Sequence, residues 1–323
     1  MKRAALILLL IALMLPIASS QYRYGDVEVV FTDRGAITVT RGAITIGTSN
    51  FRTWGPDWSW AATCSEQSDW NIVSSPTATE TIVSVECSSR CSFASISWRV
   101  RAWIGLDALL MEINATADDD SSFAGVAWDF ELPIAFFKGK SVEALFPNGS
   151  TVTVKLREEH VPGNWTIAYF TGGVGWIVPF EEGGGLLIAV FGDIWPTGMD
   201  LEVQDFREWG GTSYALRNWL FFDLTMFKGQ RLRILVYVHP YANETELEEA
   251  KALVRDVMNR LAWGESLTTI REYIVSGLKL EEAAIIRRTQ GPPLMFIAFL
   301  AFIIVAGTLI SYVLLKGRRI RRP

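Results

Sequence analysis

The chain has 323 residues, of which 50% are hydrophobic and 12% aromatic, and its formal net charge is −5. This composition excludes a disordered stalk, because disordered segments carry too few apolar and aromatic residues to build a core. The acidic balance disfavours nucleic acid as a partner, since nucleic-acid-binding domains need a basic face. The length permits one large β domain or two small ones.

The first 20 residues have the layout of a secretory signal peptide. Lys2 and Arg3 precede an apolar run that ends at Pro16, and small residues at 18–20 offer a cleavage site before Gln21. The alternative is an uncleaved membrane anchor, which the shortness of the apolar run disfavours. We therefore expect a mature chain that begins at residue 21.

Short strands separated by turn residues dominate from residue 22 to residue 241, and no helical pattern of convincing length interrupts them. Residues 95–103 alternate apolar and polar side chains, as expected of a half-buried strand. The clearest hairpin joins 141–146 to 151–156 through a Pro-Asn-Gly-Ser turn. Many short strands without helical crossovers predict a mainly β domain, a large antiparallel β-sandwich over residues 21–242.

A tryptophan-dense loop, predicted to be irregular, lies between Phe51 and Trp70. A sugar ring presents an apolar C–H face that stacks on exposed aromatic rings, while neighbouring carboxylates accept its hydroxyl groups. A single tryptophan is more often part of a core, so the prediction rests on the cluster. The candidate glycan-binding residues are Trp54, Asp57, Trp58, Trp60 and Trp70.

The three cysteines are Cys64, Cys87 and Cys91. One disulfide is expected in an extracellular domain, and Cys64 can pair with either of the others, which leaves one thiol over. The two histidines, His160 and His239, do not lie near a cysteine in sequence. We therefore predict neither a metal site nor a cofactor.

Four Asn-x-Ser/Thr sequons lie in the predicted extracellular segment. In a secreted or surface domain this motif is the acceptor for N-linked glycans. The predicted glycosylation sites are Asn114, Asn148, Asn164 and Asn243.

Helical periodicity begins only at Thr245, where Thr245 and Glu248 form a predicted capping box. Apolar residues at helical spacing continue to Leu261, and a second amphipathic stretch runs from 266 to 288. We name residues 243–290 the juxtamembrane helices. Either they pack on the sandwich or they form a stalk or an oligomer contact, because amphipathicity alone does not identify the partner.

Residues 294–315 contain no charged side chain and are predicted to form one transmembrane helix. At ~1.5 Å per residue this segment covers about 33 Å, enough to cross a bilayer core of ~30 Å. The tail at 316–323 carries five basic residues, which favours the cytoplasmic side. The predicted topology is single-pass type I in the cell membrane, with the sandwich extracellular.

The strands of residues 22–241 resemble the two-sheet supersandwiches of the galactose-mutarotase-like group, which occur in carbohydrate-active proteins. The resemblance rests on long aromatic-rich strands and on two sequence features. In the first, residues 130–133 (Phe-Glu-Leu-Pro) are followed by residues 137–140 (Phe-Lys-Gly-Lys); in the second, residues 221–225 (Phe-Phe-Asp-Leu-Thr) precede the strand at 231–239. It implies one large sandwich with a carbohydrate-related role. The competing interpretation is two immunoglobulin-like sandwiches of ~100 residues each. The histidine motifs of epimerases in the group are not recognisable here, so no catalytic residue is assigned.

Three functional hypotheses follow. The first is a membrane-anchored surface glycoprotein whose sandwich binds carbohydrate or an envelope partner without catalysis. The second is a glycan-active enzyme of the epimerase, lyase or hydrolase type, which requires a histidine beside a carboxylate. Its candidate groups are His160, His239, Glu158, Glu159, Asp193 and Asp205. The third is a structural subunit, for instance a homo-oligomer, that assembles through residues 245–290 and the membrane span.

Overall fold

The computed structural model describes residues 21–31, 36–58, 61–63, 83–91, 96–105, 107–192 and 194–278, all within the larger of the chain's two units. Among these residues no helix is long and apolar enough to cross a membrane. The predicted signal peptide, membrane helix 294–315 and basic tail 316–323 lie outside the described residues, so they stay predictions.

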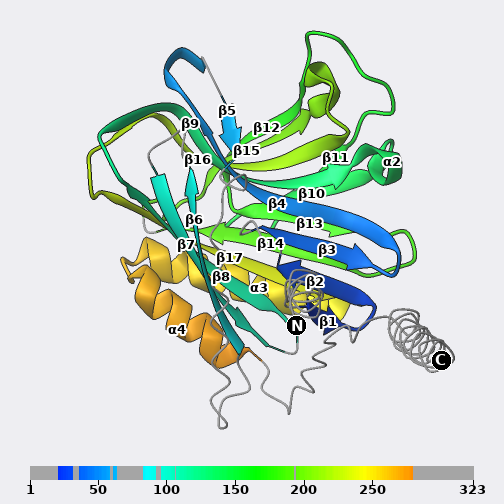
Figure 1. Ribbon diagram of the computed structural model, residues 1–323. Helices are drawn as coiled ribbons and strands as arrows, with labels where there is room; N and C mark the ends of the chain where they lie inside the picture. Colours follow the sequence, from blue (N-terminus) through cyan, green and yellow to red (C-terminus); the bar gives the residue numbers. More distant parts are fainter. Residues whose placement is uncertain are drawn as a thin grey trace, which may run out of the picture. The chain divides into compact units, whose positions relative to one another are not determined.

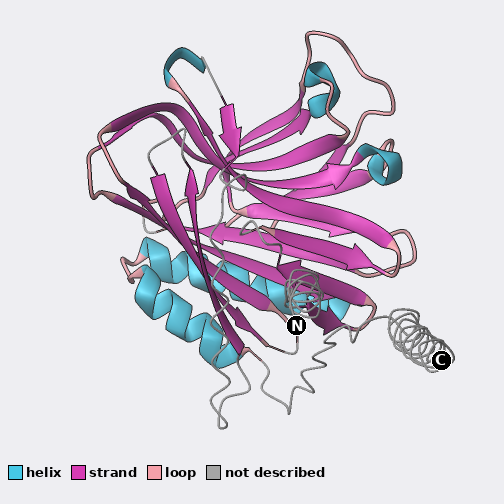
Figure 2. Cartoon of the chain, in the orientation of Figure 1, coloured by secondary structure: helices cyan, strands magenta, loops and turns pink. Residues whose placement is uncertain are grey.

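Two antiparallel sheets contain the strands of the described chain (Figures 1 and 2). The first is nine-stranded, and its strands in spatial order are β1 (Gln21–Tyr24), β2 (Val27–Phe31), β3 (Ile37–Arg41), β4 (Ile44–Trp54), β9 (Ser121–Pro133), β16 (Ser213–Met226), β15 (Met199–Asp205) and β12 (Thr166–Gly173), with β5 (Ala61–Thr63) paired to β4.

The second sheet is eight-stranded within the same described ranges. Its order is β11 (Thr151–Lys155), β10 (Ser141–Leu145), β13 (Gly175–Pro179), β14 (Gly185–Phe191), β17 (Arg231–Tyr241), β8 (Leu109–Ala117), β7 (Ile96–Ile104) and β6 (Val83–Cys91). Strands from both halves of the sequence pair in each sheet. The prediction of one large antiparallel sandwich is therefore confirmed, and the alternative of two small sandwiches is wrong.

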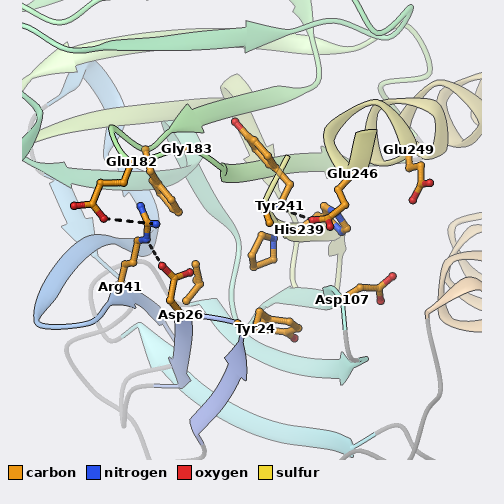
Figure 3. A pocket seen from close by; sticks show the side chains of 15 residues that line it. Tyr24, Asp26, Arg41, Asp107, Glu182, Gly183, His239, Tyr241, Glu246 and Glu249 are labelled. Atoms are coloured by element: carbon orange, nitrogen blue, oxygen red, sulfur yellow. Dashed lines mark hydrogen bonds and ion pairs between the residues drawn. The ribbon is translucent and has the colours of Figure 1, made fainter. Parts of the chain in front are cut away.

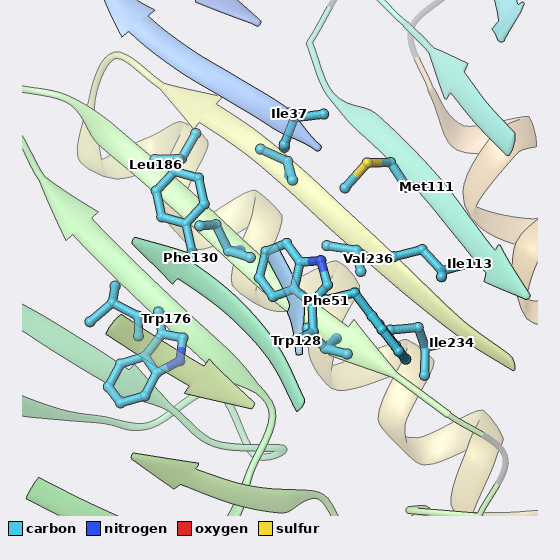
Figure 4. Packing of buried hydrophobic residues seen from close by; sticks show 14 of the residues in the cluster. Ile37, Phe51, Met111, Ile113, Trp128, Phe130, Trp176, Leu186, Ile234 and Val236 are labelled. Carbon is cyan, nitrogen blue, oxygen red and sulfur yellow. The ribbon is translucent and has the colours of Figure 1, made fainter. Parts of the chain in front are cut away.

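The main core fills the space between the two sheets (Figure 4). Along β9 the side chains alternate, so that Trp128 and Phe130 point into this core together with Phe51 of β4. Trp176 on β13 is also fully buried. The predicted hairpin of β10 and β11 is confirmed by its register from Ser141↔Lys155 to Leu145↔Thr151.

Helices α3 (Glu244–Ala262) and α4 (Leu267–Gly277) cover the eight-stranded sheet on the side away from the main core (Figure 1). Their apolar residues form a second core with that sheet, and Val254, Val257 and Ile270 are completely buried in it. The first of the two alternatives for these helices is thus confirmed as far as residue 278: they pack on the sandwich.

The start of α3 differs from the predicted capping box. The cap is Asn243, whose Oδ1 accepts from the N–H of Glu246 at 3.1 Å, while Glu246 Oε2 accepts from the N–H of Ala242 at 2.7 Å. The prediction of Thr245 with Glu248 was wrong by two residues. Asn243 and Glu246 have the same spacing, and asparagine caps a helix at least as well as threonine.

Replacing Asn243 by alanine should lower the free energy of unfolding by about 1 kcal/mol, because the N–H of Glu246 at the start of α3 loses its side-chain acceptor. Denaturant unfolding of protein made in a host without N-glycosylation measures this. Thr245→Ala is the matched control, since it removes the same sequon from an exposed position and leaves the cap intact. Equal losses in the two variants would contradict the assigned cap.

Candidate functional site

The nine-stranded sheet carries charged residues on the face opposite the main core. The register places Asn50 opposite Asp129, Asp129 opposite Arg217, and Arg217 opposite Glu202. Directly opposed residues on antiparallel strands lie side by side on one face of the sheet. These four side chains therefore form one polar row across β4, β9, β16 and β15.

Arg217 and Asp129 form a buried ion pair at the centre of this row. Arg217 Nε and Nη2 donate to the two carboxylate oxygens of Asp129, both at 2.8 Å, and Nη1 donates to Gln204 Oε1 at 2.6 Å. Arg217 is 2% exposed and Asp129 is completely buried. The bidentate geometry and the third acceptor supply the partners that a desolvated guanidinium needs.

The same guanidinium packs against two tryptophans. Its central carbon lies 4.4 Å from the ring centroid of Trp54 and 4.7 Å from that of Trp219. Both distances are within the range of cation–π attraction, which is stronger in a desolvated setting. Trp219 is fixed further, because its indole N–H donates to Glu202 Oε2 at 2.9 Å.

Arg52 and Glu131 form the more accessible part of the polar face. Arg52 Nε lies 3.1 Å from Asp129 Oδ2, and its Nη2 donates to Glu131 Oε1 at 2.5 Å. Glu131 also accepts from Asn50 and from Ser213. The Arg52 and Glu131 side chains are 21% and 18% exposed, so both reach solvent while their orientations are held by partners.

Trp54 belongs to a strand and not to an irregular loop. Residues Phe51–Trp54 pair with Gly125–Trp128 of β9, so β4 runs four residues into the segment that was predicted to be irregular. The loop prediction was wrong there because pairing with β9, which lies far along the chain, overrode local composition. The short 3-10 helix η1 (Pro56–Trp58) follows.

Trp58 completes a group of three indoles, which we call the tryptophan cluster: Trp54, Trp58 and Trp219. The Trp58 ring lies 5.9 Å from each of the other two, and 52% of Trp58 is exposed. The three rings gather over Gly125, where an added Cβ would come within 2.8 Å of the Trp219 ring. A larger residue at this position would therefore displace the Trp219 ring.

The backbone that presents Trp58 is strained. Asp57 and Trp58 have φ angles of +56° and +60°, a left-handed conformation that is rare for residues other than glycine. Such conformations cost on the order of 1–3 kcal/mol and concentrate at functional sites. Trp60 and Trp70, the other tryptophans of the predicted site, lie outside the described residues.

A second aromatic group borders the charged residues. The guanidinium carbon of Arg52 lies 4.8 Å from the Phe206 ring, and that of Arg217 lies 5.9 Å from it. Phe206 and Trp209, in the 3-10 helix η3 (Phe206–Trp209), are in ring contact, and Trp209 contacts Trp165. Trp165 and Trp209 are both exposed. Charged groups thus lie between two sets of aromatic rings.

His160 meets two carboxylates. Its Nε2 lies 3.2 Å from Glu208 Oε2, and its Nδ1 lies 3.9 Å from Asp205 Oδ2. Burial raises the pKa of Asp205, but hydrogen bonds and charge from Arg207 outweigh it, so this pKa lies below its ordinary value. The structure therefore brings together one predicted pair, His160 and Asp205, and adds Glu208.

Of the other predicted groups, Glu158 and Glu159 directly precede this histidine in the chain. Glu158 and Glu159 are exposed, His239 is buried beside Tyr237 on β17, and Asp193 lies outside the described residues.

The predicted glycosylation sites differ in accessibility. Asn148, Asn164 and Asn243 are exposed, whereas Asn114 is half-buried in the middle of β8. Cys64 lies outside the described residues, and Cys87 and Cys91 are described only by their backbone in β6. The disulfide stays a prediction.

Sequence reasoning missed Asp129, Glu131 and Arg217. A signal was present, because each is a charged residue within an otherwise apolar strand, in Trp128-Asp-Phe-Glu-Leu132 and Ala215-Leu-Arg-Asn-Trp219. Charge at alternate positions of such strands indicates a face that is built for something other than the core.

Asp129→Ala should lower the free energy of unfolding by about 3–5 kcal/mol, because it leaves the buried Arg217 guanidinium without its carboxylate. Denaturant titration followed by tryptophan fluorescence measures the loss. Asp26→Ala is the control: it removes a carboxylate from an ion pair with Arg41 in which Asp26 is largely exposed, and about 0–1 kcal/mol is expected. Similar losses in both variants would show that the pair of Asp129 with Arg217 contributes no more to the free energy of unfolding than an exposed ion pair does.

No protein-family model matches the sequence, and no curated protein matches it. Solved structures similar to this fold include a galactose mutarotase-like protein from Lactobacillus casei (7% identity, TM-score 0.44, covering 69% of this chain and 99% of that one). A galactose mutarotase related enzyme from Lactobacillus acidophilus is also similar (8% identity, TM-score 0.39, 70% and 98%).

An α-N-acetylgalactosaminidase from Bifidobacterium bifidum is similar too (13% identity, TM-score 0.46, 73% of this chain and 39% of that one). The names of two of these three structures refer to galactose mutarotase, the group that the sequence resembles. At these TM-scores the similarity carries no conclusion about activity. The chain is a two-sheet antiparallel β-sandwich with two helices on one sheet, and its own strand pairings establish this.

Proposed function

We propose that this protein is a membrane-anchored surface protein that binds carbohydrate, without catalysis, on the charged face of its nine-stranded sheet. The observation that carries the proposal is the tryptophan cluster on the sheet face that also carries Arg52 and Glu131. An exposed indole, Trp58, is held against two less accessible ones, and Arg52 and Glu131 of the same face reach solvent.

The chemistry of the face suits a sugar. An exposed indole offers a flat apolar surface for the C–H face of a pyranose, and a carboxylate and a guanidinium elsewhere on the same face can exchange hydrogen bonds with hydroxyl groups of a glycan. Arg217 and Asp129 support this surface from beneath and fix Trp54 and Trp219. Pre-organised side chains lose less conformational entropy on binding, which favours affinity.

The location is proposed from the sequence. A signal peptide at 1–20, a membrane helix at 294–315 and a basic tail at 316–323 would place the sandwich outside the cell. Exposed sequons at Asn148, Asn164 and Asn243 are compatible with glycosylation in that location.

Trp58→Ala should weaken glycan binding by about tenfold, equal to ~1.4 kcal/mol, because the ring loses its stacking contact with the sugar. The melting temperature should change little, since the ring is half exposed. A glycan array probed with the full-length protein, followed by titration of the best ligand, measures binding. Trp263→Ala is the matched control, because Trp263 is 90% exposed on the helical side. If Trp58→Ala and Trp263→Ala bound alike, the cluster would not be the binding surface.

A second candidate function is a glycan-active enzyme, favoured by the contact of His160 with Glu208 and Asp205. A histidine between carboxylates can act as a general acid or base. NMR of oligosaccharides and reducing sugars incubated with the full-length protein would show anomeric exchange or cleavage that His160→Gln abolishes while binding persists. A wild-type protein that binds sugar but converts none would exclude this candidate.

A further inference from the structure

A cavity of about 420 Å³ lies away from the candidate carbohydrate face (Figure 3). The turn between β1 and β2 forms one side. The end of β3, Asp107 between β7 and β8, the loop after β13, the end of β17 and the first turns of α3 form the rest. Its volume is within the ~300–1,000 Å³ typical of small-molecule sites. It shares no residue with the tryptophan cluster.

Carboxylates dominate the lining of the cavity. Five acidic side chains line it, against one guanidinium, Arg41. Arg41 already pairs with Asp26 at 2.5 Å and approaches Glu182 at 3.8 Å. The other acidic lining residues are Asp107, Glu246 and Glu249. An excess of carboxylates in a recess with apolar walls favours a cation, because low-dielectric walls strengthen the field inside.

The hydroxyl group of Tyr24 is a second feature of the cavity, independent of the carboxylate charges. Tyr24 lines the cavity and is only 8% exposed, and its hydroxyl oxygen is buried without a hydrogen-bond partner among the described residues. An unsatisfied buried hydroxyl costs about 1–3 kcal/mol. Burial raises the pKa of Tyr24 and the charge of Asp107 raises it further, so the hydroxyl is neutral and its oxygen can accept from a ligand N–H.

Aromatic rings provide the apolar walls. Phe180, Tyr241 and His239 line the cavity, and the His239 ring is stacked on Tyr237, whose hydroxyl is 3.2 Å from His239 Nδ1. Such walls suit methylene groups and attract a positive charge through their ring faces. Within the described residues, no group of three or more His, Cys, Asp or Glu side chains is arranged to hold a metal ion. An organic cation therefore fits the cavity better than a metal ion.

We propose that this cavity, which we call the amine pocket, binds a small aliphatic primary amine. The ammonium group donates to the lining carboxylates and to the Tyr24 hydroxyl oxygen, and the methylene chain packs against the aromatic rings. A primary ammonium is favoured over a quaternary one because only the former has N–H groups to satisfy Tyr24. The proposal does not depend on carbohydrate binding at the other face.

Isothermal titration calorimetry of the full-length protein in detergent tests the proposal with three probes. Putrescine carries a primary ammonium group at each end, tetramethylammonium carries one positive charge without N–H groups, and 1,4-butanediol has the same length as putrescine without the charge. We expect saturable binding of putrescine, binding of tetramethylammonium weaker by about tenfold, and no measurable binding of the diol.

Two substitutions assign the site. Tyr24→Phe removes only the unpartnered hydroxyl, and Asp107→Asn removes one carboxylate; each should weaken putrescine binding about five- to tenfold. Tyr24→Phe should leave the melting temperature unchanged or raise it, because the hydroxyl has no partner to lose. Asp119→Asn is the control for non-specific attraction, since Asp119 is an exposed carboxylate on another turn that pairs with Lys228.

The proposal is overturned if putrescine does not bind, if the diol binds as well as putrescine, or if tetramethylammonium binds equally well. It also fails if Tyr24→Phe or Asp107→Asn binds like wild type, or if Asp119→Asn loses as much affinity as they do. Should Asp107→Asn not fold, Tyr24→Phe alone decides, because phenylalanine keeps the shape of the ring.

Discussion

The pairing of Arg217 with Asp129 is the interaction on which the candidate face depends. The two residues lie opposite each other on β16 and β9, in the middle of the nine-stranded sheet, and neither is accessible to water. A buried ion pair of this kind is not a source of stability in itself, since desolvation offsets much of the attraction. The pair instead fixes the positions of neighbouring side chains. The Arg217 guanidinium packs against Trp54 and Trp219, and Asp129 contacts Arg52, which in turn binds Glu131.

The alternation of side chains along β4, β9 and β16 makes such a face possible. One set of side chains, including Phe51, Trp128 and Leu216, forms the core between the sheets. The intervening positions are then free to carry charge without interrupting that core. The cost is that each buried polar group must find a partner within the same face. The network of Asp129, Arg217 and Gln204 meets that condition.

The eight-stranded sheet is used differently, because α3 and α4 cover its outer face. Their apolar residues are buried against that sheet, so assembly of this protein through residues 245–278 would have to use the polar side of the helices. The first two turns of α3 also contribute Glu246 and Glu249 to the amine pocket. The helices therefore both close the second core and complete a cavity that the strands alone would leave open.

Local patterns in the sequence determined much of the fold. Period-two alternation and turn residues are properties of neighbouring positions. The strand at 95–103 (β7, Ile96–Ile104) and the hairpin of β10 and β11 were therefore predicted closely, as was the apolar side of α3. The candidate role of Trp54 and Trp58 also came from their spacing in the sequence.

Only the tertiary structure decided which strands are neighbours. Strand pairing across long stretches of chain is selected by the packing of the whole core, and no local pattern encodes it. For that reason the sequence could not show that Trp219 joins Trp54 and Trp58 or that Arg217 faces Asp129. Nor could it show that Tyr24, near the start of the sandwich, lines a cavity with Tyr241 at its end.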